Sequence, residues 1–223
     1  MEKSKPRTYR IFCYGDSNTY GYDPRDGSRY EENERWPDVL QSILNACASE
    51  DMRYSVLADG LNGREIDVSS EGEEDISGAV YRRTLFRVFP FDLLLIMLGS
   101  NNIPKGDSAE KITAGLLRMC NSCETWMEQK TGQRPSVLIL APPEFREQST
   151  FFVGNLERMA KESRALPSYF RRMANSHGYD FLDSNDVIEA GLWDGIHMTP
   201  ENHRTLARAA ASKVLKIAGR RDV

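Results

Sequence analysis

The sequence predicts an α/β protein in which a parallel sheet is covered by helices on both faces. Strand-like runs and helical patterns alternate along the 223 residues, which is typical of parallel strands joined by helical crossovers. Two runs, DLLLIML at 92–98 and SVLILA at 136–141, are apolar throughout, as expected for strands buried on both faces. No repeat or break in composition divides the chain, so we expect one domain over residues 1–223 with a core from about residue 9 to 218.

Five short runs account for the predicted strands. They cover residues 9–14, 54–58, 92–98, 136–141 and 179–183. Right-handed crossovers between parallel strands leave few topologies. In such a sheet, ligands bind beyond the carboxyl ends of the strands, near a switch in strand order. The residues that follow each strand are therefore the first place to look for a functional site.

Five helical patterns lie between and after these strands. They cover residues 36–49, 75–89, 108–130, 155–176 and 200 to about 218. Pro37 suits the first turn of its helix, and Thr199 suits an N-cap. Asp107 and Glu110 have the spacing of a capping box before the third helix. The fourth pattern is interrupted at Pro167.

Composition argues against several classes of function. The net charge of −4 is mild, and Lys and Arg are scattered, so we expect no nucleic acid partner. The first residues, MEKSKPRTYR, lack the apolar core of a signal peptide, and no apolar stretch approaches the roughly 20 residues of a membrane span. We therefore expect a soluble, cytoplasmic protein that contacts no membrane.

The four cysteines give no disulfide framework in a chain of this length. Cys120 and Cys123 have the C-x-x-C spacing of a redox or zinc site. Both fall on the apolar face of the 108–130 pattern, and no second ligand pair accompanies them, so the sequence favours buried core cysteines. DSND at 183–186 invites a cation-binding interpretation, but capping of the next segment is favoured.

Polar motifs follow four of the five predicted strands. GDS at 15–17 follows the first strand, DGLNGRE at 59–65 the second and LGSNN at 98–102 the third. WDGIHMTPE at 193–201 comes after the fifth strand and a short helix-like segment. A doubly wound sheet would bring all four motifs to one edge.

Together these motifs contain the parts needed for acyl transfer. A serine such as Ser17 needs an adjacent base to become a nucleophile, and neutral His197 can supply that base. Asp194 lies three residues before His197 and can orient its imidazole. The amide of Asn101 and a backbone N–H near Gly63 can stabilise an oxyanion.

Each of these residues also has a purely structural interpretation. The GDS motif can be an ordinary β-to-α turn, Asp194 can form an Asx-turn before the last helix, and His197 can be a structural histidine. The other two histidines, His177 at a helix end and His203 inside the last helix, fit structural positions better. The presence of all four motifs together favours the catalytic interpretation.

The chain resembles the SGNH hydrolase superfamily, also known as the GDSL esterase/lipase family, and is most similar to its arylesterase/acyltransferase branch. YGDSNTYG at 14–21, GLNGRE at 60–65, LGSNN at 98–102 and DGIH at 194–197 resemble the four family blocks in order. The similarity runs from about residue 10 to residue 215. It implies a flavodoxin-like, three-layer α/β/α sandwich with a five-stranded parallel sheet.

The resemblance also assigns roles to single residues. It makes Ser17 the nucleophile, His197 the general base and Asp194 the carboxylate that orients it. The oxyanion donors would be the Ser17 N–H, the Gly63 N–H and the Asn101 side chain.

Three positions leave questions open. Gly60 lies three residues before Gly63 and is the alternative glycine donor. Asn102 stands where the family usually has Asp, and an amide lacks the ionised acceptor of a carboxylate. Asn18 replaces the Leu of the family's name-giving motif.

The function implied by the resemblance is that of a serine esterase. We expect short-chain acyl esters, with acetyl favoured, as small-molecule or acetylated-carbohydrate substrates, and no metal or organic cofactor. An acyltransferase that uses the same acyl-enzyme is the first alternative. A non-catalytic module that binds carbohydrate or a partner protein on the same scaffold is the second. The branch is often oligomeric, so a homo-oligomer is an alternative to a monomer.

Residues near the nucleophile and in two long loops, 19–35 and 142–154, are candidates for substrate binding. They are Asp16, Tyr20, Tyr22 and Phe145. Phe151 and Phe152 are further aromatic residues of the second loop. The sequence leaves three alternatives open for Phe145 and these two phenylalanines: lining of an acyl pocket, an oligomer contact or packing in the core.

Overall fold

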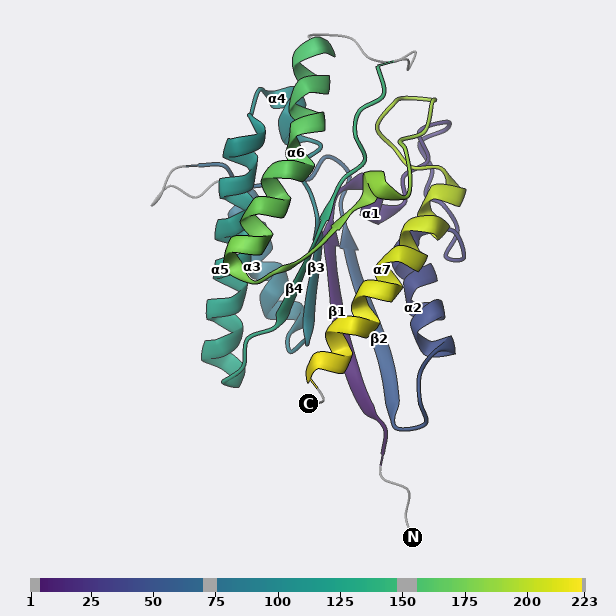
Figure 1. Cartoon of the computed structure of the whole chain (residues 1–223), viewed down its shortest axis with the longest axis vertical. Coiled ribbons are helices and arrows are strands. Elements are labelled where there is room, and N and C mark those ends of the chain that lie inside the picture. Colours follow the sequence, from purple (N-terminus) through teal and green to yellow (C-terminus); the bar gives the residue numbers. More distant parts are fainter. Residues whose placement is uncertain (1–4, 70–75, 148–155, 222–223) are drawn as a thin grey trace.

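A computed structural model of the chain describes residues 5–69, 76–147 and 156–221. Its sheet has five parallel strands in the order β2-β1-β3-β4-β5 (Figure 1). The strands are β1 (Arg7–Gly15), β2 (Met52–Gly60), β3 (Leu93–Met97), β4 (Ser136–Ala141) and β5 (Asp180–Asp183). This is the flavodoxin-like order, in which the switch point lies between β1 and β3. The predicted fold class and all five predicted strands are confirmed.

Helices cover both faces of the sheet (Figure 1). One face carries α2 (Trp36–Ala46) and α7 (Pro200–Arg221), and the other carries α3 (Ile76–Val88), α5 (Ala109–Thr131) and α6 (Leu156–His177). Two four-residue helices, α1 (Ser17–Tyr20) and α4 (Asn102–Lys105), and a 3₁₀ turn at Ser184–Asp186 follow the ends of strands. The sequence patterns predicted the five long helices and a short helix-like segment after the fifth strand, where the 3₁₀ turn lies. They missed α1 and α4, because a single turn shows no periodicity.

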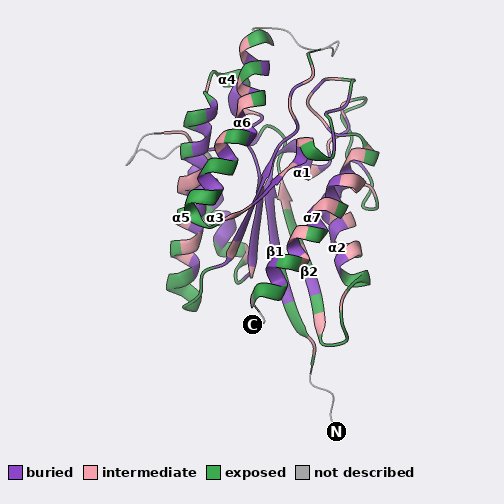
Figure 2. Cartoon of the chain, in the orientation of Figure 1, coloured by how far each residue is buried: buried purple, intermediate pink, exposed green. Residues whose placement is uncertain are grey.

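The alternation of side chains along the strands produces two separate cores. In β1, Ile11 and Cys13 face α2 and α7, whereas Phe12 and Tyr14 face α3 and α5. All five residues of β3 are buried, as the purple interior of the sheet shows (Figure 2). Full burial of one such side chain contributes roughly 1.5–3 kcal/mol, so the sheet centre is a stable platform for the loops at its edge.

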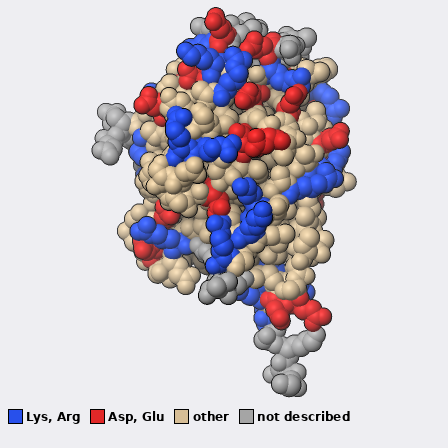
Figure 3. All heavy atoms as spheres, viewed as in Figure 1, with Lys and Arg blue, Asp and Glu red and all other residues tan. Residues whose placement is uncertain are grey.

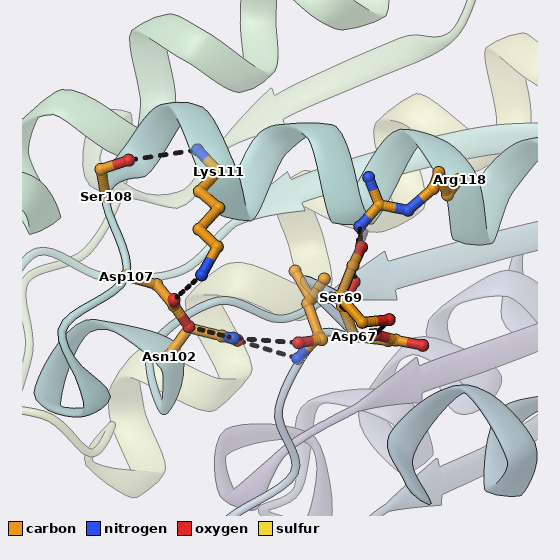
Figure 4. Close-up of polar contacts among 8 residues, drawn as sticks. Asp67, Ser69, Asn102, Asp107, Ser108, Lys111 and Arg118 are labelled. Carbon is orange, nitrogen blue, oxygen red and sulfur yellow. Dashed lines mark hydrogen bonds and ion pairs between the residues drawn. The ribbon is translucent and has the colours of Figure 1, made fainter. Parts of the chain in front are cut away.

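Two details of the helices differ from the sequence predictions. Pro167 lies inside α6, which continues through it. The N-cap of α5 is Ser108, whose side chain accepts a hydrogen bond from the Lys111 N–H at 3.3 Å. The predicted capping box on Asp107 is therefore wrong, because the Asp107 carboxylate instead accepts hydrogen bonds from Lys111 Nζ and the Asn102 amide (Figure 4).

Two glycines allow α1 to sit directly on the strand ends. Gly15 and Gly60 are paired at the carboxyl ends of β1 and β2. A Cβ on Gly15 would lie 2.0 Å from Thr19 Oγ1, and a Cβ on Gly60 would lie 2.1 Å from the Tyr20 nitrogen. Neither position can hold a side chain without moving α1. This close approach fixes Ser17, the first residue of α1, at the edge of the sheet.

Acidic and basic side chains are interspersed on the face shown in Figure 3. Within the described ranges, no helix is long and apolar enough to cross a membrane.

Candidate active site

The structure brings Ser17, His197 and Asp194 together. Ser17 Oγ lies 2.8 Å from His197 Nε2, although 180 residues separate the two. On the other side of the imidazole, His197 Nδ1 is in hydrogen-bond contact with Asp194 Oδ2. Ser17 opens α1 after β1, whereas the other two residues lie in the loop before α7. The three side chains thus form one continuous chain of contacts.

Asp194 combines both interpretations that the sequence left open. Its Oδ1 accepts hydrogen bonds from the N–H groups of Ile196 and His197, each at 3.0 Å, which is an Asx-turn arrangement. Its Oδ2 contacts the His197 ring. Burial alone would raise the pKa of Asp194, but the hydrogen bonds and charge of His197 together lower it. Asp194 therefore stays ionised and can orient a neighbouring imidazole.

Asn18 connects the first residues of α1 to the loop that carries His197. Its Oδ1 accepts a hydrogen bond from the Met198 N–H at 3.0 Å, and its Nδ2 donates to the Ile196 carbonyl at 3.3 Å. The side chain is only 2% exposed. Asn18 departs from the family motif in the sequence, which did not predict this contact. An asparagine where the motif has an apolar residue was the available signal.

Asp16 is buried beneath the same turn. It is the N-cap of α1, and its Oδ1 accepts the Asn18 N–H at 3.0 Å. Complete burial is the largest influence on this carboxyl group. It outweighs the Asn18 hydrogen bond and the charge of His197, and raises the pKa of Asp16 to about 6. Asp16 has no exposed surface. It therefore stabilises the first turn of α1 and is not accessible to a substrate.

Two of the three predicted oxyanion donors, Asn101 and Gly63, lie in neighbouring segments. Asn101 Nδ2 donates to the Arg64 carbonyl at 3.0 Å, which leaves its second N–H for another acceptor. Gly63 precedes Arg64, is exposed, and has a φ of +76° that favours glycine. Nothing lies within 4 Å of the position of a Cβ on Gly63. The space beside Gly63 is therefore open, unlike the crowded space beside Gly60.

Arg64 is a buried cation that the sequence analysis did not single out. Its guanidinium donates to the Gly15 carbonyl at 2.8 Å and to Asp59 Oδ1 at 2.6 Å. It also stacks on the Tyr14 ring, 4.0 Å from the centroid. These contacts tie the Gly63 segment to the ends of β1 and β2. An arginine directly after a motif glycine gives no sequence signal for such a role.

Asn102 holds the same segment from the other side (Figure 4). Its Oδ1 accepts the Ile66 N–H at 2.8 Å, and its Nδ2 donates to the Ile66 carbonyl at 2.9 Å and to Asp107 Oδ2 at 3.1 Å. A carboxylate could not make the two donor contacts. Further along, the Arg118 guanidinium donates to the Ser69 carbonyl at 2.8 Å. The asparagine that departs from the family pattern therefore suits this chain.

The substrate-binding candidates have different surroundings. The Tyr22 ring lies 4.8 Å from the His197 ring, beside the three contacting residues. The Tyr20 ring is covered by the Arg29 guanidinium at 4.5 Å and borders a separate surface groove near β2. Phe145 is buried in the hydrophobic cluster on the α5–α6 face. Of these three, Tyr22 makes a ring contact with His197. Phe151 and Phe152 lie outside the described residues.

The other predicted structural residues occupy the core or helix ends. Cys120 and Cys123 are buried free cysteines, and burial raises the pKa of both thiols. His203 is fully buried and accepts the Trp36 N–H, and burial lowers its pKa to about 3. Asp183 caps the 3₁₀ turn by accepting the Asn185 N–H. Over the described part of the chain, no group of three or more His, Cys, Asp or Glu residues could hold a metal ion.

Such an arrangement has a specific chemical capacity. A serine hydroxyl within hydrogen-bond reach of an imidazole, itself held by a carboxylate, can attack an acyl carbon. Amide and backbone N–H groups at the same edge can stabilise the resulting oxyanion.

Comparisons with known proteins agree with this capacity. The model of the GDSL-like lipase/acylhydrolase family matches residues 13–205. No curated protein matches the chain significantly.

Solved structures of esterases have the same architecture. A carbohydrate acetylesterase from Sinorhizobium meliloti is 25% identical, with a TM-score of 0.81 over 94% of this chain and 99% of that chain. A carbohydrate acetylesterase family member from the same organism is 29% identical, with a TM-score of 0.82 over 95% and 99% of the two chains. An inhibitor-bound aryl esterase from M. smegmatis is 28% identical, with a TM-score of 0.80 over 93% and 99%. The chain is therefore a member of the GDSL-like lipase/acylhydrolase family and a carboxylic ester hydrolase.

Proposed function

We propose that this protein is a serine esterase that hydrolyses short-chain acyl esters, preferably acetyl esters, through an acyl-enzyme on Ser17. The observation that carries the proposal is the continuous contact from Ser17 through His197 to Asp194. Each residue has the chemistry that its place in this series requires.

In the first half of the reaction, Ser17 Oγ attacks the carbonyl carbon of the ester while its proton passes to His197 Nε2. The tetrahedral oxyanion accepts hydrogen bonds from the N–H groups of Ser17 and Gly63 and from the Asn101 amide. The Ser17 N–H suits this role, because the first N–H groups of a helix have no intrahelical partner. Collapse of the intermediate breaks the bond to the alcohol oxygen, which takes the proton from His197.

In the second half, His197 removes a proton from a water molecule that attacks the acyl-enzyme. The new intermediate collapses, Ser17 Oγ regains a proton from His197, and the carboxylic acid leaves. Asp194 stabilises the imidazolium in both halves and itself stays ionised.

The choice of the acetyl group rests on the relatives, and the choice of the alcohol rests also on the surroundings of Ser17, Asp194 and His197. Two of the similar structures are named as a carbohydrate acetylesterase and a member of that family, and a third as an aryl esterase. The ring of Tyr22 borders His197. Leu192 and Trp193, just before Asp194, are 60% and 49% exposed. Exposed apolar surface near the triad suits the flat face of a sugar or aryl alcohol.

The test is hydrolysis of p-nitrophenyl acetate by the wild type and by Ser17→Ala. We expect the variant to lose nearly all activity and the wild type to be labelled on Ser17 by a fluorophosphonate. Equal rates for the two proteins would overturn the proposal. A series of p-nitrophenyl esters with longer acyl chains, together with an acetylated sugar, then tests the substrate: kcat/KM is expected to be highest for acetyl.

A further inference from the structure

Hydrogen bonds between its own residues hold the loop that carries Asp194 and His197. The Gly191 N–H donates to the His197 carbonyl at 2.7 Å, and the Gly195 N–H donates to the Gly191 carbonyl at 3.1 Å. Asp194 adds its two bonds to the backbone N–H groups of the same loop. The Asp194–His197 pair is therefore held mainly by contacts within the loop. One further bond, from the Arg146 N–H to the Gly195 carbonyl at 2.9 Å, ties the loop to the segment after β4 and not to Ser17.

We propose that Asn18 is a positioning residue that fixes His197 relative to the nucleophile. Asn18 directly follows Ser17, and its amide binds the backbone on both sides of His197, at the Ile196 carbonyl and the Met198 N–H. One planar amide thus sets both the distance and the orientation of the imidazole toward Ser17 Oγ. This inference rests on the proposed function, in which His197 accepts the proton of Ser17.

Burial makes the Asn18 contacts costly to lose. The Asn18 side chain is 2% exposed, and Met198 is 1% exposed. If Asn18 is replaced by an apolar residue, the buried Met198 N–H loses its partner in a place with little access to water, and the half-buried Ile196 carbonyl loses its partner as well. The loop is then expected to shift until these groups find other partners. The ring contact between Tyr22 and His197 has no comparable directionality.

The chain offers a matched control in Asn185. Its Oδ1 accepts the Glu144 N–H at 2.8 Å, and its Nδ2 donates to the Pro142 carbonyl at 3.3 Å. Asn185 thus spans a carbonyl and an N–H two residues apart, as Asn18 does. It braces the segment after β4, whose Arg146 N–H donates to the Gly195 carbonyl, and none of the hydrogen bonds described for Asn185 involves Ser17, Asp194 or His197.

The experiment compares Asn18→Leu with Asn185→Leu in the full chain. For Asn18→Leu we expect kcat for p-nitrophenyl acetate to fall about 10²-fold with KM little changed, because small displacements of reacting groups cost rates of this order. For Asn185→Leu we expect a comparable fall in Tm but a kcat close to that of the wild type. Asn18→Asp, which keeps the acceptor for Met198 and a similar size, is expected to lie between wild type and Asn18→Leu.

A spectroscopic signature separates positioning from general damage. We expect the proton between Asp194 Oδ2 and His197 Nδ1 to give a downfield ¹H NMR signal at low pH in the wild type. The signal is expected to persist in Asn18→Leu, because this pair is held mainly within its own loop. Persistence of the signal with a large loss of kcat supports the inference. A kcat within a factor of about two of wild type, or an equal loss of kcat in Asn185→Leu, overturns it.

The proposed function and this inference fail in different ways. If the wild type hydrolyses p-nitrophenyl acetate and Ser17→Ala does not, but Asn18→Leu retains full kcat, only the positioning role is wrong. If the wild type neither hydrolyses the ester nor reacts with a fluorophosphonate, the proposed function fails and the positioning role fails with it. If the variants Asn18→Leu and Asn18→Asp both lose the downfield signal, the loop itself depends on Asn18. The inference that the loop holds the Asp194–His197 pair while Asn18 only positions it relative to Ser17 is then wrong.

Discussion

His197 Nε2 lies 2.8 Å from Ser17 Oγ, and the two residues come from opposite ends of the chain. The short distance depends on contacts that position α1, which carries Ser17, and on contacts that position the loop of His197. Gly15 and Gly60 let α1 approach the strand ends, and Asn18 holds the loop of His197. Four further predictions concern the neighbouring side chains of Asp194, Asn101, Asn102 and Asp16.

Asp194→Asn should separate the two tasks of this side chain. The amide oxygen can still accept the N–H groups of Ile196 and His197, so Tm should change little. The amide cannot stabilise the imidazolium, and kcat/KM for p-nitrophenyl acetate should fall by about 10⁴. Asp183→Asn is the matched control, because Asp183 also caps a turn through a backbone N–H but lies outside the triad. Equal kcat/KM values for the two variants would contradict the orienting role.

Asn101→Ala should lower kcat by about 10²–10³ and leave KM nearly unchanged, because an oxyanion donor acts mainly in the transition state. The variant also loses the bond from Asn101 Nδ2 to the Arg64 carbonyl, so Tm must be measured alongside. Asn121→Ala serves as a control, since Asn121 lies on α5 and only bonds the Tyr179 hydroxyl among the contacts described for it. A rise in KM at constant kcat would instead indicate a role in ground-state binding.

Asn102→Asp, which restores the residue usual in the family, should destabilise this chain. The new carboxylate would face the Ile66 carbonyl and the Asp107 carboxylate, which now accept from Asn102 Nδ2. We expect a loss of about 3 kcal/mol in the free energy of unfolding, measured by urea titration at neutral pH.

The double variant Asn102→Asp/Asp107→Asn should recover part of this loss, because the amide at 107 can donate to the carboxylate at 102. Asp107→Asn alone should have a small effect, since its amide oxygen can still accept from Asn102. If the single variant Asn102→Asp is as stable as wild type, the pairing of Asn102 with Asp107 has no energetic weight.

Asp16→Asn should change the pH dependence of stability. Burial raises the pKa of Asp16 from 3.8 to about 6 in the folded protein. The native state therefore binds the proton more tightly than the unfolded state, and this group lowers stability as pH rises from about 4 to about 6. Asn at this position cannot titrate. Between pH 4 and pH 7, the difference in unfolding free energy between Asp16→Asn and wild type should therefore shift in favour of the variant by about 2–3 kcal/mol.

Urea titrations of both proteins between about pH 4 and pH 7 measure this difference. Asp26→Asn is a control of opposite sign, because hydrogen bonds from Ser28 lower the pKa of the exposed Asp26 carboxyl. Asp26 contributes stability above its unfolded pKa, so its replacement should become slightly less favourable as pH rises. A pH-independent difference between Asp16→Asn and wild type would show that Asp16 is not a buried titrating group.

The sequence by itself determined the fold class and the location of the candidate site. The continuous apolar runs at 92–98 and 136–141 and the alternation of strands with helices predicted the parallel sheet, because these are local patterns. Motifs at the ends of four strands predicted that Ser17, Asn101, Asp194 and His197 share one edge. Parallel strands force that outcome once the fold class is known.

Only the tertiary structure decided how that edge is held together. The contacts of Asn18 with residues 196 and 198, of Asn102 with Ile66, and of Arg64 with Gly15 join segments that are distant in sequence. The tertiary structure also places Phe145 in the core. The Asp107 carboxylate accepts a hydrogen bond from Asn102 and does not cap α5. Periodicity and motif spacing depend on neighbours along the chain. The partner of a buried polar group depends on which loops the folded sheet places beside it, and the sequence carries no local signal for that choice.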